Sequence, residues 1–163
     1  MEELIIPEPP EEIHPLRHMF VSNEIAKKLY EFGFNEPCFA YFRRSYTIED
    51  KYVFHIVGEY HNYNDYYQNY VGVGLSNREM DRNPVGKKST CFTAPLYQQV
   101  IDWFRVKYLI LIHVSDALGG GYYSTISKGK NGTNDNFIKG EIYDNYYPAF
   151  ENAIIEALKL IKS

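Results

Sequence analysis

The sequence predicts an α+β fold, in which an antiparallel or mixed β-sheet is packed by about three helices in a single domain. Apolar residues recur at helical spacing in three segments, and short runs of aromatic and β-branched residues lie between them. The length of 163 residues fits one domain. We expect residues 1–21, which are rich in proline and glutamate, to form an extended arm before a domain at residues 22–163.

Each expected helix has a start or stop signal. Ser22 or Asn23 can cap the first helix, and Gly33 stands where a left-handed C-cap is favoured. We expect Thr93 to cap the second helix and Pro148 to open the third. The apolar stripes of the three helices are Ile25, Ala26, Leu29 and Tyr30; Tyr97, Val100, Ile101 and Phe104; and Phe150, Ala153, Ile154, Ala157, Leu158 and Ile161.

The segment after the first helix predicts a β-hairpin. Residues 39–42 and 52–57 are rich in aromatic and β-branched side chains, which favour strands. The polar residues 48–51 between them can form the turn.

Three further strands are expected before the last helix. Residues 109–114 form a continuous apolar run, which is typical of a central strand. Residues 122–127 and 137–143 predict two strands joined by a turn around Asn131-Gly132. Together with the three helices, this order of elements supports the α+β assignment.

Composition excludes several classes of function. The net charge of -4 argues against a general affinity for DNA or RNA. No apolar stretch approaches the length of a membrane span, and the N-terminus does not resemble a signal peptide, so we expect a cytoplasmic protein. Cys38 and Cys91 are then expected to be reduced, buried thiols.

The motifs that would fix a catalytic chemistry fail on inspection. Gly86-Lys87-Lys88-Ser89 resembles a phosphate loop, but Asp81 stands where that motif needs its first glycine. His14 and His18 have metal-like spacing, but we interpret them as surface residues of the arm. His55 and His113 are expected to be hydrogen-bonded sheet residues. We therefore expect no catalytic residues, no metal and no cofactor.

The sequence does predict a recognition surface. An insert at about residues 60–92 is rich in tyrosine and asparagine and ends in a basic stretch. Tyrosine offers a flat ring for stacking and a hydroxyl for hydrogen bonding, while a few cations can hold phosphates. The candidate ligand-binding residues are Arg43, Arg44, Tyr60, His61, Tyr63, Tyr66, Tyr67, Tyr70, Arg78, Arg82, Lys87, Lys88, Tyr122 and Tyr123. The alternative is that these tyrosines cover a sheet face or a subunit interface.

Three blocks of sequence resemble small proteins of Bacteroidetes phages and prophages. They run from Phe20 to Phe42, from Ala94 to Tyr108 and from Tyr146 to Lys162, and they coincide with the three expected helices. The resemblance implies a protein made in an infected bacterial host cell. Small phage proteins of this character include sponges that sequester nucleotide immune signals, such as cyclic ADP-ribose isomers, ADP-ribose conjugates or cyclic oligonucleotides. The insert is where the chain departs most from the pattern of the family.

The leading hypothesis is a phage counter-defence protein that binds a nucleotide-derived immune signal without cleaving it, and that forms a homo-oligomer. The first alternative is a protein-interaction module that inhibits a host defence protein. The second is a signal-degrading enzyme, for which His61 or Asp65 would be the first residue to substitute.

Overall fold

The computed structural model describes residues 15–44, 51–57, 74, 76–80, 91–129 and 136–162. It confirms the expected α+β fold, in which three helices pack with two three-stranded antiparallel sheets. The helices are α1 (Asn23–Glu31), α3 (Tyr97–Tyr108) and α4 (Tyr146–Lys162), and two shorter elements are a 3₁₀ turn, η1 (Arg17–Met19), and α2 (Asn77–Met80). The strands are β1 (Ala40–Arg44), β2 (Tyr52–Ile56), β3 (Cys91–Thr93), β4 (Ile110–Asp116), β5 (Tyr122–Lys128) and β6 (Asn136–Tyr143).

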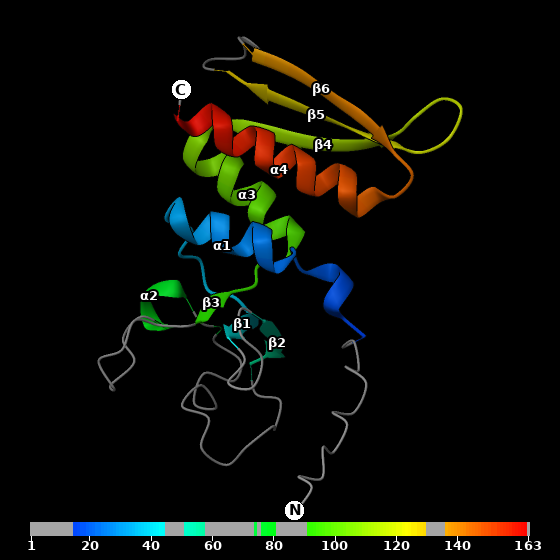
Figure 1. Ribbon diagram of the computed structural model, residues 1–163. Coiled ribbons are helices and arrows are strands. Elements are labelled where there is room, and N and C mark those ends of the chain that lie inside the picture. The colour runs from blue at the N-terminus through cyan, green and yellow to red at the C-terminus, as the bar shows by residue number, and fades with distance from the viewer. Residues whose placement is uncertain are drawn as a thin grey trace, which may run out of the picture.

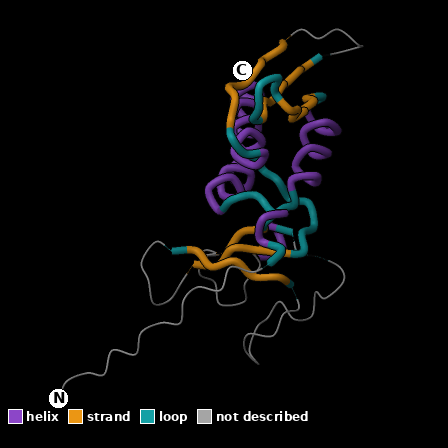
Figure 2. The backbone as a smooth tube through the Cα atoms, turned by 90° about the vertical axis from the view of Figure 1, so that its right-hand side faces the viewer, coloured by secondary structure: helices purple, strands orange, loops and turns teal. Residues whose placement is uncertain are grey.

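The helices lie between the two sheets. Figure 1 shows the β4-β5-β6 sheet at the top, with α4 and α3 below it and α1 below them, and the β2-β1-β3 sheet at the bottom. The same succession of layers is seen from the side in Figure 2. Helix α4 packs against all three strands of the upper sheet and also contacts α1 and α3. The two sheets therefore share one core, which runs through the helical layer.

The strand pairs agree with the two hairpins expected from the sequence. Strands β1 and β2 run antiparallel, with Ala40 opposite Ile56, and β3 pairs with the other side of β1. Strands β5 and β6 are also antiparallel, with Ile126 opposite Ile138. The expected turns, at residues 48–51 and around Asn131, lie largely or wholly outside the described residues.

Helix α4 builds much of the shared core. Its residues Ala149, Phe150, Ala153, Ile154, Ala157 and Leu158 are all buried. Positions three and four residues apart lie on one face of a helix, so these side chains form one continuous apolar stripe. At the C-terminal end, Lys128 of β5 donates a hydrogen bond from Nζ to the Leu160 carbonyl, at 2.7 Å. This bond provides one of the last helical carbonyls with a partner.

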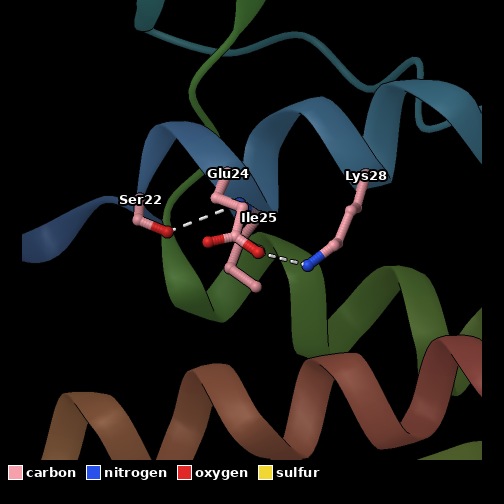
Figure 3. Close-up of polar contacts among 4 residues, drawn as sticks. All are labelled: Ser22, Glu24, Ile25 and Lys28. Atoms are coloured by element: carbon pink, nitrogen blue, oxygen red, sulfur yellow. Dashed lines mark hydrogen bonds and ion pairs between the residues drawn. The ribbon is translucent and has the colours of Figure 1, made fainter.

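Both ends of α1 are capped as the sequence predicts. The Ser22 hydroxyl accepts a hydrogen bond from the Ile25 N–H, as Figure 3 shows together with the Glu24–Lys28 ion pair one turn apart. At the other end, Gly33 has φ +80°, its N–H donates to the Tyr30 carbonyl, and the Phe34 N–H donates to the Leu29 carbonyl. These two bonds define a Schellman motif, which ends the helix and turns the chain toward the core.

The expected start of the second helix at Thr93 is wrong. Residues Cys91–Thr93 form β3, and α3 begins at Tyr97, where the Gln99 side chain accepts the Leu96 N–H at 2.9 Å. The cause is a long-range contact. The Thr93 N–H donates to the side chain of buried Asn77 at 2.8 Å, which in turn donates to the Phe34 carbonyl at 2.7 Å. Thr93 therefore ends a strand instead of capping a helix.

The interpretation of residues 109–114 as a central strand is also wrong. Among the described residues, β4 pairs only with β5, so it lies at the edge of its sheet. Ile110 and Ile112 are buried, whereas the Leu111 side chain is 51% exposed. The apolar run therefore belongs to a strand with one buried face and one exposed apolar face. Hydrophobicity alone does not distinguish such a strand from one with both faces buried.

Gly33 provides a test of the α1 C-cap. A Cβ at this position would meet no other atom within 4 Å, so Gly33→Ala adds only the cost of a left-handed backbone. We expect the free energy of unfolding to fall by about 1 kcal/mol in Gly33→Ala and by less in Gly33→Asn, because asparagine tolerates this conformation better. Urea unfolding checks the prediction, and equal stability of all three proteins would contradict the Schellman assignment.

Candidate ligand-binding site

The structure does not bring the described members of the sequence-predicted site together. Arg43 and Arg44 lie at the end of β1 in the lower sheet, whereas Tyr122 and Tyr123 lie on β5 in the upper sheet, beyond the helices (Figure 1). Tyr122 packs edge-on against Tyr146 of α4, while Tyr123 has Lys139 Nζ over its ring at 5.0 Å. The candidates that lie outside the described residues are Tyr60, His61, Tyr63, Tyr66, Tyr67, Tyr70, Arg82, Lys87 and Lys88.

Arg78 lies on α2 and lines a pocket of about 470 Å³ beside the C-terminal end of α1. Its backbone N–H donates to the Asn35 side chain at 2.7 Å. The neighbouring Asn77 is buried, and its side-chain amide donates to the Phe34 carbonyl and accepts from the Thr93 N–H. The polar groups of Asn35 and Asn77 are thus used to hold the fold in this pocket.

A larger pocket, of about 530 Å³, lies where η1 and the start of α1 meet α3 and α4. Its volume is within the range of small-molecule sites. Three separate segments of the chain supply its walls. The lining residues are Arg17, His18, Phe20 and Ser22 from the N-terminal segment, Tyr97 from α3, and Tyr147, Pro148, Glu151, Asn152 and Ile155 from α4.

Aromatic rings form one wall of this pocket. The Tyr97 and Tyr147 rings stack with centroids 5.3 Å apart and an interplanar angle of 29°, and His18 meets Tyr147 edge-on at 6.2 Å. The Tyr97 ring also packs edge-on against buried Phe150, at 5.0 Å, which fixes its position against the core. A flat, partly exposed Tyr147 ring held by neighbours on two sides is suited to stacking with a planar ligand.

A carboxylate is fixed at the centre of the site. Glu151 Oε1 accepts a hydrogen bond from the Ser22 backbone N–H at 2.7 Å and another from the Tyr97 hydroxyl at 3.1 Å. Burial, followed by the nearby Glu151 charge, raises the pKa of Tyr97 well above its ordinary value of 10.0. Tyr97 therefore stays protonated and remains a hydrogen-bond donor at physiological pH.

Arg17 connects the pocket to the lower sheet. Its Nη1 donates to the Phe20 carbonyl at 2.9 Å and to the Val21 carbonyl at 3.1 Å. The guanidinium lies over the rings of Phe42 and Phe54, about 5 Å from each centroid. Burial lowers the pKa of Arg17, although nearby Tyr97 and Glu151 act in the opposite direction. Arginine nevertheless keeps its charge near neutral pH, so the site holds one fixed cation and one fixed anion.

Another pocket, of about 490 Å³, lies between α3 and the segment that leads into β1. Asp102, one of its lining residues, pairs with Arg105 on the exposed side of α3, at 2.7 Å, and Lys107 lies over the Trp103 ring. The described lining of this pocket lacks a partly buried carboxylate that accepts hydrogen bonds from two other segments. The Glu151 pocket has such a carboxylate. We therefore take the Glu151 pocket as the candidate site.

Sequence reasoning missed this site. The sequence alone places His18 on the arm and Tyr97 on an apolar helical stripe. The residues that meet at Glu151 are far apart in the chain, since Ser22 and Glu151 are separated by 129 positions. One local signal was present, because Tyr146 and Tyr147 stand directly before Pro148, at the start of α4, where a helix end exposes side chains.

The remaining titratable candidates do not form a reactive cluster in the described part of the chain. No group of three or more His, Cys, Asp or Glu residues there could hold a metal ion. Cys38 and Cys91 are buried and form no disulfide, and burial raises the pKa of Cys38 to about 12. His55 stacks on Tyr41 at 5.2 Å within the lower sheet, and His113 lies exposed on β4.

None of the described helices is long and apolar enough to cross a membrane. Comparison with protein-family models, with curated proteins and with solved structures found no match to this chain. The functional argument therefore depends on the geometry of the site.

The hydrogen bond from Tyr97 to Glu151 predicts a specific pH dependence of stability. Because folding raises the pKa of Tyr97, its contribution is fully present below about pH 10, the unfolded value, and is lost as the pH rises toward the folded value. We expect Tyr97→Phe to lower the free energy of unfolding by about 1 kcal/mol near pH 8.

The difference between the two proteins should then shrink as the pH rises above about 10. Urea unfolding of wild type and Tyr97→Phe at a series of pH values checks this trend. A difference that stays constant across the series would mean that the Tyr97 hydroxyl does not ionise differently in the folded and unfolded states.

Proposed function

We propose that this protein binds a small nucleotide-derived ligand and sequesters it without cleaving it. The observation that carries the proposal is the pocket in which the stacked pair Tyr97 and Tyr147 lies beside the fixed Glu151 carboxylate. A nucleobase has a planar face that can stack on an aromatic ring and N–H groups on its edge that can donate to a carboxylate. The pocket provides a partner for each of these features.

The arrangement of Glu151 favours binding over turnover. One of its oxygens is held by two donors from different segments, which fixes the direction in which the carboxylate can accept a third. Tyr97, which donates to Glu151, is kept protonated by burial, and Arg17 is directed at backbone carbonyls. These groups serve recognition, since neither is placed to act as a nucleophile.

The resemblance to phage proteins extends the proposal to a biological role. A cytoplasmic protein that removes a nucleotide immune signal from an infected cell would act as a counter-defence protein, and it would need no catalytic residue. The tyrosine-rich insert at residues 60–92 could contribute further contacts to the same ligand or bind a host protein, and the experiment below separates these possibilities.

The test is recovery of the bound ligand. The purified protein is incubated with adenosine and guanosine nucleotides, cyclic ADP-ribose isomers and cyclic oligonucleotides, then filtered, denatured and analysed by mass spectrometry. An intact nucleotide at near-stoichiometric yield is the expected result. A cleaved product would show that the protein degrades the ligand instead of sequestering it. If no nucleotide is bound in any mixture, the proposal is overturned in favour of a protein partner.

Substitutions in the pocket locate the site once a ligand is found. We expect Tyr147→Ala to weaken binding about ten- to a hundred-fold, because one stacked base is worth about 1–3 kcal/mol. Tyr123→Ala is the matched control. Tyr123 lies under Lys139 on the face of the upper sheet that points away from α4, because its neighbour Tyr122 packs against Tyr146 of that helix. Titration calorimetry measures both affinities.

A double variant, Tyr66→Ala with Tyr67→Ala, tests the site that the sequence predicts. If it abolishes binding while Tyr147→Ala has no effect, sequestration stands but the Glu151 pocket is the wrong site. If Glu151→Gln and Tyr147→Ala both weaken binding and the double variant does not, the pocket is the site.

A further inference from the structure

The upper sheet has an open edge at β4. This seven-residue strand pairs with β5 along its whole length, from Ile110 opposite Lys128 to Asp116 opposite Tyr122. Among the described residues no strand pairs with its other side. The backbone N–H and C=O groups along such an edge can pair with another chain.

The two edges of this sheet differ in how they are protected. On β6, Gly140 and a register irregularity opposite residues 123–125 interrupt the ladder, and exposed Lys139 and Glu141 carry charge. Breaks and charges of this kind discourage edge-to-edge pairing. Strand β4 has no proline, lysine or bulge, and its register with β5 is regular throughout.

Exposed apolar side chains gather at the start of β4. Val106, Leu109 and Leu111 are 76%, 52% and 51% exposed. Leu109 is also the one non-glycine residue with a positive φ, +56°, in the described part of the chain. Glycine is favoured in this left-handed conformation. A leucine here therefore keeps an exposed apolar side chain at a cost in backbone strain.

The charges at the two ends of β4 are complementary. Arg105 and Lys107 lie in the last turn of α3, immediately before the strand, and exposed Asp116 ends it. In an antiparallel pair of identical strands the start of one lies beside the end of the other. Each Asp116 would then lie toward the Arg105 and Lys107 of the other copy, and like charges would not face each other.

We propose that β4 pairs with β4 of a second copy of this chain, antiparallel and about a two-fold axis near His113, the middle residue of the strand. The two upper sheets would then form one continuous six-stranded sheet. With the axis at His113, this exposed residue faces its own copy, and Leu111 lies opposite Ser115 of the other chain on the same outer face. This register pairs all seven residues of each strand and places exposed Leu111 against the other chain. The proposal does not depend on which residue of the other chain contacts Leu109, nor on the ligand-binding function.

Sedimentation velocity over a range of protein concentrations tests the assembly. We expect a reversible dimer whose dissociation constant rises at least about ten-fold in His113→Lys, because two lysines would then meet at the axis. Ile142→Lys is the matched control. Ile142 is 63% exposed on the same outer face but lies on β6, so this variant should dimerise like wild type.

Leu109→Gly separates assembly from folding. Glycine removes the exposed side chain and relieves the left-handed backbone, so the monomer should be as stable as wild type or more stable while the dimer weakens several-fold. A wild-type protein that stays monomeric at every concentration overturns the proposal. So does an Ile142→Lys variant that dissociates as fully as His113→Lys, because that result would indicate packing of sheet faces.

Cross-linking checks the position of the axis. Under mild oxidation His113→Cys should form a disulfide-linked dimer, whereas Ile142→Cys should not. The native thiols give little background because Cys38 and Cys91 are both buried. Cross-linking of Ile142→Cys in preference to His113→Cys would contradict edge pairing.

Discussion

The packing of the α4 stripe is the constraint on which the rest of the structure depends. Six of its side chains are buried, and the helix contacts three strands on one side and α1 and α3 on the others. Three of the six are alanines at four-residue intervals, Ala149, Ala153 and Ala157, and small side chains let neighbouring elements approach closely. Truncating Phe150 or Ile154 would therefore loosen the upper sheet and the helical layer, at a cost of several kcal/mol typical of large-to-small core changes.

The candidate pocket follows from the same packing. With the apolar stripe of α4 directed into the core, the adjacent face of that helix presents Tyr147, Glu151 and Ile155 to the segment around Ser22. Edge-on contact between Tyr97 and buried Phe150 links the aromatic wall to the core. Arg17 extends the connection to the lower sheet through Phe42 and Phe54. The polar residues of the site are thus placed by apolar contacts behind them.

The helices and hairpins could be predicted from the sequence because their signals are local. Ser22 and Gly33 cap α1 with neighbours within a few residues, and the apolar stripe of α4 repeats within its own length. Two predictions failed for non-local reasons. Thr93 is held in a strand by Asn77, sixteen positions away, and the number of strands beside 109–114 is not encoded in its hydrophobicity. The Glu151 pocket was missed for the same reason, since it exists only where three distant segments meet.

The hydrogen bond between the Ser22 N–H and Glu151 links ligand binding in the pocket to folding of the chain. It closes a loop that includes most of the chain, so the pocket exists only when the whole tertiary structure is formed. A molecule held there would bind the native state and not the unfolded chain, and it would act as a non-covalent clasp across that loop. By mass action, each tenfold rise in its free concentration above the dissociation constant would add about 1.4 kcal/mol to the free energy of unfolding. The lifetime of the protein in a cell would then follow the abundance of the molecule that it binds.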